Sequence, residues 1–340
     1  MGGVTACLEV VDAGPASSFQ DAGRFGFVSY GVAPAGPCDP LLHAIANGLV
    51  GNPADAATIE YTLRGDTYKV SASSCRIAIA GDFLIEIDGQ RVDAWRAHTL
   101  YKGQTLSVLY ASQGVRGYIA VAGGFALDPV LGSVSTHARS GIGPLGGGTL
   151  KSGDRVPLAL SDVTPDGEME FDRSALPALT SEVRVVLGPQ VEHFSDADID
   201  ALRDGLFTVT PQSDRMGCRL DGPVINYRKD RPLISEGIAL GSIQAPGEGL
   251  FIVALYDRQT VGGYPKIATA ISADIREITQ ARQGARLRFR AIDVVEAQRH
   301  ARTRKALIDS IRDHIRPVSV FDMSSERLLS LNLISGVYAA

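Results

Sequence analysis

The sequence predicts a mainly β protein made of two repeated domains with a few short helices. Glycine accounts for 37 of the 340 residues, about 11% against an average near 7%. No Gly-X-Y period and no excess of proline accompany it, which excludes collagen-like and low-complexity chains. Short runs of alternating apolar and polar residues recur, and glycine-containing turns separate them. Glycines in tight turns and bulges are typical of β-rich folds.

The first half has the clearest strand pattern. Two apolar runs are joined through Gly81-Asp82, and the dipeptide Asp88-Gly89 then favours a two-residue hairpin turn before a return strand. Two more alternating runs follow, separated by a short polar turn. Strands are therefore expected at 75–80, 83–87, 90–95, 105–110 and 115–121.

Three segments favour helices instead. Asp39-Pro40 provides an N-cap followed by proline at the first turn, and a glycine- and proline-containing stop follows at 51–53. Ser195 is the predicted cap of a second helix at 195–206, whose first turn carries acidic residues. The basic segment 294–315 has a helical apolar pattern, and we expect its charged face to be solvated.

The chain divides at a polar segment, 161–181, which is rich in Asp, Glu, Pro and Ser and is the best candidate for a linker. Three weak internal similarities occur in the same order on both sides of it, which favours duplication of a β domain. They pair 20–26 with 212–217, 59–65 with 235–241, and 151–158 with 282–289. The predicted units are an N-terminal domain at 1–175, a C-terminal domain at 176–295 and a helical extension at 296–340.

Charge and cysteine content exclude several classes of protein. A net charge of −5 argues against a nucleic-acid-binding surface. The four cysteines are widely separated and form no C-x-x-C pair, so reduced thiols are expected rather than a disulfide framework. No signal peptide is visible and no apolar run approaches about 18 residues. We therefore expect a cytoplasmic protein with no membrane contact.

Motifs for common cofactors are missing or out of context. The segment 141–146 spells G-x-G-x-x-G, but neither a clear strand before it nor a helix after it supports a dinucleotide site, so a loop is expected. The chain has no P-loop, no G-x-S-x-G and no biotin-attachment A-M-K-M. Its six histidines are scattered, and no metal site is predicted.

Polar side chains gather in three glycine- and proline-rich segments, at 20–39, 210–217 and 257–266. Loops that combine Arg, Gln, Asp and Lys offer donors for an anion or amide and a base. The alternative is that Asp214-Arg215 and Asp257-Arg258 form ion pairs that only fix the loops. Both interpretations remain open at this point.

Long and uncommon strings in these segments resemble the biotin-dependent carboxyltransferase-like proteins. This family includes KipA, allophanate hydrolase subunit 2, the C-type subunit of the prokaryotic 5-oxoprolinase and the carboxyltransferase region of urea carboxylase. The resemblance extends from Leu8 to Val295. Its main carriers are S-F-Q-D-x-G-R-x-G at 18–26, T-V-T-P-Q-S-D-R-M-G at 208–217 and D-R-Q-T-x-G-G-Y-P-K-I-A at 257–268.

The resemblance implies two tandem cyclophilin-like β-barrel domains, in line with the duplication. It implies a hetero-oligomer with a KipI-like protein, the B-type subunit of 5-oxoprolinase. In that enzyme a LamB-like protein, the A-type subunit, joins them and helps to open the lactam of 5-oxoproline with ATP. In urea carboxylase the homologous region passes a carboxyl group to urea from carboxybiotin on a separate carrier. ATP with the partner subunits, or carboxybiotin, is thus the cofactor that the family implies.

Our hypothesis is the C-type subunit of an ATP-dependent 5-oxoprolinase acting on a lactam or urea-like amide. One alternative is a biotin-dependent carboxyltransferase or allophanate hydrolase subunit 2 that acts on urea or a related amide. Another is a KipA-type regulator without catalysis, which binds a KipI-like kinase inhibitor. The sequence does not decide among the three.

Amide activation needs a donor to the carbonyl oxygen and a base or anion clamp near the nitrogen. The predicted catalytic residues are Arg215 and Arg258 as clamps, with Lys266 and Asp214 as proton-transfer or orienting groups. The predicted substrate-binding residues are other polar side chains of the same segments and of the intervening strands. They are Gln20, Asp21, Arg24, Asp39, Ser213, Glu236, Gln244, Gln259, Thr260 and Tyr264.

Overall fold

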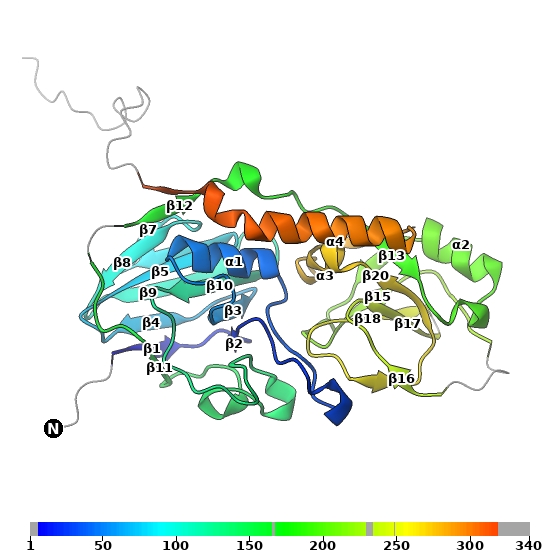
Figure 1. The fold of residues 1–340 in the computed structure, drawn as a ribbon, viewed down its shortest axis with the longest axis horizontal. Coiled ribbons are helices and arrows are strands. Elements are labelled where there is room, and N and C mark those ends of the chain that lie inside the picture. The colour runs from blue at the N-terminus through cyan, green and yellow to red at the C-terminus, as the bar shows by residue number, and fades with distance from the viewer. Residues whose placement is uncertain (1–5, 165–166, 229–233, 248, 319–340) are drawn as a thin grey trace, which may run out of the picture.

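Two β-rich halves lie side by side, and a long helix runs across both of them (Figure 1). The computed structural model describes residues 6–164, 167–228, 234–247 and 249–318. Within these residues the strands far outnumber the four α-helices, so the mainly β prediction is confirmed. Residues 319–340 of the predicted C-terminal extension lie outside the described residues.

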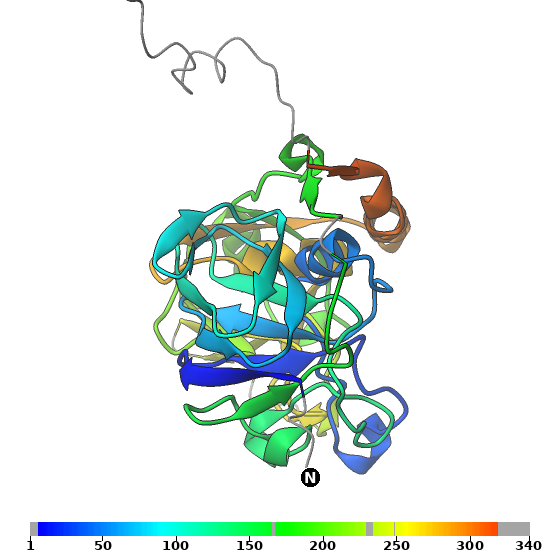
Figure 2. The ribbon, with the colours of Figure 1, turned by 90° about the vertical axis from the view of Figure 1, so that its left-hand side faces the viewer.

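Two antiparallel sheets form the first half. In spatial order the six-stranded sheet contains β11 (Arg155–Pro157), β1 (Cys7–Asp12), β4 (Thr67–Val70), β9 (Thr105–Ala111), β6 (Phe83–Ile87) and β7 (Gln90–Val92). The five-stranded sheet contains β2 (Ser18–Gln20), β3 (Thr58–Thr62), β10 (Arg116–Val121), β5 (Ser74–Ala80) and β8 (Ala97–Tyr101). Figure 2, viewed from this end, shows the sheets curling around a shared core with α1 on the outside.

The five-stranded sheet is covered on both faces, which explains its sequence pattern. In β5 the isoleucines Ile77 and Ile79 enter the core between the two sheets, whereas Ala78 and Ala80 lie in the cluster under α1 (Pro40–Leu49). Successive side chains of a strand point to opposite faces, so the Ile-Ala alternation gives one face bulk and leaves the other room for a helix. Every residue of β10 is buried for the same reason.

The second half is a closed seven-stranded barrel around a single apolar core. Its strands, in order around the barrel, are β13 (Glu182–Leu187), β20 (Lys266–Ala270), β17 (Ser242–Gly247), β18 (Leu250–Ala254), β15 (Gly217–Asp221), β14 (Phe207–Val209) and β21 (Arg286–Ala291). A two-stranded ribbon of β16 (Glu236–Gly237) and β19 (Val261–Gly262) lies beside the barrel. Closure leaves the barrel without free sheet edges.

The predicted helix starts and the hairpin turn are confirmed. The Asp39 side chain accepts hydrogen bonds from the first-turn backbone N–H groups of α1. Ser195 caps α2 (Asp196–Asp204) in a reciprocal capping box with Asp198. Asp88 and Gly89 both have positive φ, at 50° and 77°, as a type I′ hairpin turn requires. The four cysteines are free and buried, and 141–146 lies in a loop region with short 3-10 turns.

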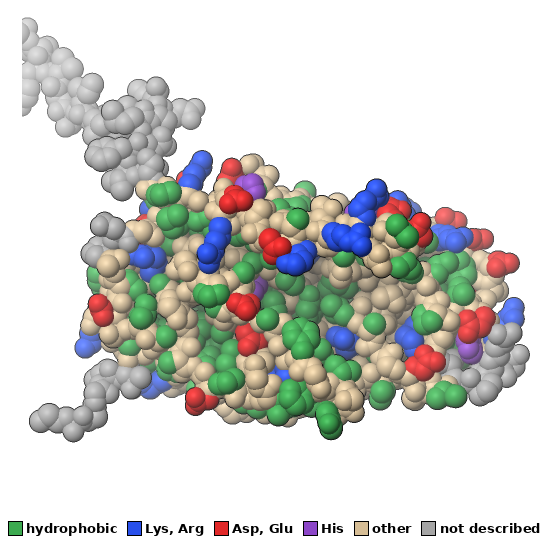
Figure 3. All heavy atoms as spheres, in the orientation of Figure 1, with side chains coloured by type: hydrophobic (Ala, Val, Ile, Leu, Met, Phe, Trp, Pro, Cys, Tyr) green, Lys and Arg blue, Asp and Glu red, His purple; other side chains and the backbone are tan. Residues whose placement is uncertain are grey.

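Two expectations need correction. The segment 161–181 is not a plain linker, because β12 (Met169–Phe171) within it pairs with β22 (Ile315–Pro317). Helix α4 (Val294–Asp309) is not only a solvated surface: its Arg304 side chain is 16% exposed and lies 3.6 Å from Asp39 of the other half. In Figure 3 basic side chains nevertheless gather along the upper edge of the molecule, over α4. The remaining helix, α3 (Ile275–Thr279), was not predicted.

Candidate active site between the two halves

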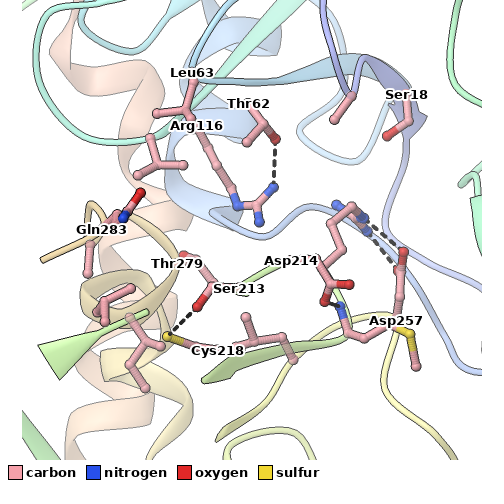
Figure 4. Close-up of a pocket in the computed structure, with 18 of the residues that line it drawn as sticks. Ser18, Thr62, Leu63, Arg116, Ser213, Asp214, Cys218, Asp257, Thr279 and Gln283 are labelled. Carbon is pink, nitrogen blue, oxygen red and sulfur yellow. Dashed lines mark hydrogen bonds and ion pairs between the residues drawn. The ribbon is translucent and has the colours of Figure 1, made fainter. Parts of the chain in front are cut away.

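A cavity of about 390 Å³ opens between the two halves of the molecule. Strands β2, β3 and β10 of the first half supply one wall, and the loop before β15 supplies the opposite wall together with α3 (Figure 4). The polar groups lining it include Ser18, Thr62, Arg116, Thr136, Ser213, Asp214, Arg215, Asp257 and Thr279. Small-molecule sites in proteins are typically clefts of this size with a few placed polar groups.

A buried carboxylate, Glu60 of β3, organises the polar side of this cavity. Its Oε1 accepts from Arg116 Nη1 at 2.8 Å and from Arg215 Nη1 at 2.5 Å. Its Oε2 accepts from the Tyr118 hydroxyl at 2.6 Å and from the Cys38 backbone N–H at 2.8 Å. Burial alone would raise the pKa of Glu60, but the guanidiniums of Arg215 and Arg116 lower it to about 2. Glu60 is therefore an anion that fixes both arginines.

Arg215 is a bridge between the halves with no donor left for a ligand. Its Nε and Nη2 bind Asp257 in a bidentate pair at 3.0 Å each, and Nη2 also donates to the Gly36 carbonyl at 2.7 Å. Its Nη1 donates to Glu60 and, at 3.2 Å, to Cys38 Sγ. A guanidinium has five N–H donors, and these contacts use all five. The Arg215 side chain thus fixes the cavity wall rather than clamping a substrate directly.

Arg116 differs from Arg215 because it keeps donors unused. It lies in β10 with 5% of its surface exposed, and its Nη1 binds Glu60 and, at 3.1 Å, Thr62 Oγ1. Its Nε is buried without a hydrogen-bond partner, and no partner for Nη2 occurs among the described residues. A second unpartnered polar atom of the lining is Thr136 Oγ1. Buried polar groups are usually satisfied, so these two atoms stand out among the polar groups around the cavity.

Asp214 is the carboxylate of the cavity that has no cationic partner among the described residues. Its Oδ1 accepts from the backbone N–H groups of Met216 and Gly217, at 2.7 Å and 3.1 Å. This arrangement holds the side chain in a tight turn while leaving Oδ2 available. Ser213, beside it, donates through its hydroxyl to the Thr210 carbonyl. Of the predicted catalytic residues, the structure therefore brings Asp214 and Arg215 into this cavity.

Asp39, a predicted substrate-binding residue, lies in a second tie between the halves. It is fully buried, and its Oδ2 accepts from Arg276 Nε and Gln280 Nε2, both at 3.0 Å. Arg276 and Gln280 belong to the α3 region of the second half, and neither they nor Asp39 line the cavity. The geometry of Asp39 is that of a helix cap and a structural ion pair.

Three more predicted residues fix the loops of the first half. Gln20 is fully buried and bonds to Ser18, Thr136 and Gly36. Asp21 accepts from several groups of the segment 133–135 and of its own loop; burial alone would raise its pKa, but these bonds lower it. Arg24 donates to three backbone carbonyls of 130–135. These contacts position the loop that carries Gly36, the carbonyl partner of Arg215.

The other predicted residues lie around the barrel, away from Arg116. A separate cavity of about 730 Å³ there is lined by Gln244, Arg258, Gln259 and Tyr264. Lys266 lines neither cavity: it is 4% exposed, and its Nζ lies 3.4 Å from Glu236. The Thr260 carbonyl accepts from the Ile238 backbone N–H and holds the β16–β19 ribbon. The structure therefore separates the predicted residues into two sites and a set of structural contacts.

Comparison with known proteins decides the family. The model of the carboxyltransferase domain, subdomains A and B, matches residues 30–291, which is most of the chain. The chain belongs to the carboxyltransferase domain family. It is 35% identical to the C subunit of 5-oxoprolinase from Escherichia coli over 291 residues, which cover 85% of this chain and 93% of the relative. It is 31% identical to the C subunit of 5-oxoprolinase from Haemophilus influenzae over 306 residues, which cover 90% of this chain and 97% of that relative.

The fold is shared with part of a larger protein of known structure. The crystal structure of the Kluyveromyces lactis urea amidolyase superposes with a TM-score of 0.83 at 25% identity and covers 95% of this chain. The match spans only 20% of the urea amidolyase chain, so this chain corresponds to about a fifth of that protein. The residues that match the carboxyltransferase domain model, 30–291, extend over both β halves of the structure.

Within this carboxyltransferase domain, sequence reasoning missed Glu60, Arg116 and Thr136. Arg116 and Glu60 do carry a signal, since each is a charged residue inside an apolar strand pattern, where a buried charge needs a partner. Their pairing is invisible in the sequence because 56 positions separate them. Among the described residues, no group of three or more His, Cys, Asp or Glu side chains is placed to hold a metal, and no helix is long and apolar enough to cross a membrane.

Proposed function

We propose that this chain is the C-type subunit of an ATP-dependent 5-oxoprolinase and that the cavity between its halves binds the cyclic amide. The observation that carries the proposal is the 35% identity to a 5-oxoprolinase C subunit over 93% of that relative. The urea amidolyase match covers a much smaller share of its relative. Such a protein works with partners, for which a KipI-like B-type subunit and a LamB-like A-type subunit are the candidates.

The geometry supports binding of a small amide. Arg116 provides unused donors that can hold a carbonyl oxygen or a carboxylate, and Glu60 fixes its position. Asp214 provides a carboxylate at the opposite wall that can orient or accept a proton at the amide nitrogen. Apolar side chains such as Leu63, Val115 and Ile278 complete the lining, and an apolar wall strengthens both polar interactions. ATP would enter the reaction with the partner subunits.

Reconstitution tests this proposal. The chain, purified with its KipI-like and LamB-like partners, should release ADP only when 5-oxoproline is present. Asp214→Asn should lower this turnover by about 100-fold, the usual size of an acid–base contribution, whereas Ser152→Ala, an exposed substitution outside the cavity lining, should leave it unchanged. If ADP release does not depend on 5-oxoproline but requires urea and a biotinylated carrier, the chain is part of a carboxyltransferase instead.

A further inference from the structure

The barrel half contains a second cavity that the proposed amide site does not use. It measures about 730 Å³ and lies between strands β15, β17 and β18 and the loops at 211–216 and 258–264. Four residues of the first loop, Pro211, Ser213, Asp214 and Met216, also line the cavity between the halves. The two cavities are therefore neighbours separated by one loop.

The lining of the barrel cavity is positively charged although the chain as a whole is acidic. Three arginines, Arg139, Arg219 and Arg258, face one carboxylate, Asp214, in a protein of net charge −5. The Asp214 carboxylate is itself offset in part by two backbone N–H groups. A concave surface lined by charges of one sign concentrates its field in the cavity and attracts the opposite ion.

Arg258 is the strongest sign of an anionic ligand. Its Nε donates to the Ile238 carbonyl at 2.9 Å and its Nη1 to the Leu255 carbonyl at 3.3 Å. No carboxylate lies within 4 Å of its guanidinium among the described residues, although the side chain is partly buried and burial lowers its pKa. Buried charges are normally paired, and the remaining N–H donors of Arg258 can bind a ligand oxygen.

The other two arginines are held by weak neutral partners. Arg219 Nη1 donates to the Gln212 side chain at 3.1 Å, and Arg139 Nη1 contacts the Met216 sulfur at 2.8 Å. Neither has a carboxylate partner among the described residues, so both can turn toward a bound anion at little cost. All three arginines of this cavity thus keep their charge available, in contrast to Arg215 and Arg276.

Glycine keeps part of the cavity wall closely packed. A Cβ at Gly262 would lie 2.6 Å from Ile238 Cδ1 and 3.0 Å from Gln244 Nε2. The backbone of β19 therefore approaches the wall that carries the Gln244 amide, and Gln259 and Tyr264 lie in the same loop. Amide and hydroxyl groups beside guanidiniums are common partners of phosphate oxygens.

We propose that the barrel cavity binds a phosphate group, either as free phosphate or as part of a nucleotide. Three arginines and one partly neutralised aspartate give a lining charge of about +2, which matches a phosphate dianion or polyphosphate better than a single carboxylate. The charges and contacts of the barrel cavity support this site independently of the proposed activity. The barrel cavity lies next to the amide cavity. If the proposed activity holds, a phosphate-containing substrate would be needed at this position.

Calorimetric titration of the full chain with pyrophosphate and, separately, with ATP tests the site. Both should bind to the wild type and weaken as salt increases. Arg219→Gln and Arg258→Gln should each weaken binding by about tenfold, the effect of losing one charged hydrogen bond. Arg288→Gln is the matched control, an exposed arginine of the same barrel outside the cavity lining, and it should bind like the wild type.

The outcomes separate the sources of the phosphate. Equal affinities indicate recognition of phosphate alone, and tighter binding of ATP indicates a nucleotide site; both support the proposal. It is overturned if neither probe binds the wild type, if glutamate or 5-oxoproline binds through these arginines and pyrophosphate does not, or if Arg288→Gln weakens binding as much as Arg219→Gln. Arg219 is exposed and, among the described residues, its side chain hydrogen-bonds to Gln212, so it keeps the test valid if Arg258→Gln fails to fold.

The titration also distinguishes this site from the proposed activity. If the reconstituted complex hydrolyses ATP with 5-oxoproline while pyrophosphate and ATP do not bind the chain, the phosphate site is wrong and the activity stands. If phosphate binds through Arg219 and Arg258 while turnover follows urea and a biotinylated carrier, the site stands and the activity is wrong.

Discussion

Arg116 and Arg215 both bind Glu60, but their structural roles differ. Arg215 uses every donor to join the halves, whereas Arg116 retains donors at the cavity. The sequence marked Arg215 as functional because it lies in a distinctive polar string, and it assigned Arg116 no role. The number of free donors on an arginine depends on distant partners such as Glu60, which no local pattern reveals.

Removing Arg215 should destabilise the protein strongly. Arg215→Met leaves the Asp257 carboxylate without its bidentate partner and removes one of two cations from Glu60. Breaking a buried ion pair on one side costs about 3–5 kcal/mol, and urea unfolding should show that loss. Arg203→Met, which breaks an exposed pair with Asp200, should cost less than about 1 kcal/mol. Equal losses for the two variants would contradict the bridging role.

Glu277 of α3 should make stability depend on pH near neutrality. Burial raises the pKa of Glu277 from 4.5 to about 7, against the lowering effect of Arg276, and its Oε2 is buried without a partner. The folded protein therefore holds this proton while the unfolded chain has lost it, so stability falls as pH rises between these two values.

Glu277→Gln removes the free-energy cost of ionising this buried carboxyl group at high pH. The variant should be more stable than the wild type above pH 7 by roughly 1 kcal/mol, because partial exposure screens the charge. The difference should shrink toward zero as the pH falls toward 4.5. Urea unfolding of both proteins across this range measures the effect. A difference independent of pH would show that the gain does not come from the buried carboxylate.

At the scale of elements, the helix starts were predictable because they are local. Asp39-Pro40 and Ser195 cap their own helices within three residues. The β12–β22 pair and α3 could not be found in this way. Met169 pairs with Pro317 across 148 positions, and α3 is only five residues long, so neither has a sequence period to detect.

Substitution at Asp39 separates its role as a helix cap from its role as an ion-pair partner. Asp39→Asn keeps an effective N-cap but leaves Arg276 without its carboxylate, and it should cost about 3 kcal/mol. Asp39→Ala loses the cap as well and should cost about 1 kcal/mol more. Chemical unfolding measures both. If Asp39→Asn matched the wild type, the tie between α1 and α3 would contribute little to stability.

At the scale of the whole molecule, the two halves are joined by buried charges as well as by α4. Glu60 with Arg215, and Asp39 with Arg276, each connect a residue of the first half to one of the second. Alternation gave five strands of the first half, β5, β6, β7, β9 and β10, and long shared strings gave the family and the barrel. The cavity between the halves could not be predicted, because it exists only where β3, β10 and the loop at 211–216 meet.

In the proposed function, Arg116 holds the amide in the cavity between the halves. The most direct test is kcat/KM for 5-oxoproline-dependent ADP release by the reconstituted complex carrying Arg116→Gln, with Arg203→Gln as a surface control. We predict a fall of about 100-fold or more, as expected when a charge-stabilising donor is lost, with the complex intact by gel filtration and the control unchanged. An intact Arg116→Gln complex with wild-type kcat/KM would contradict the claim.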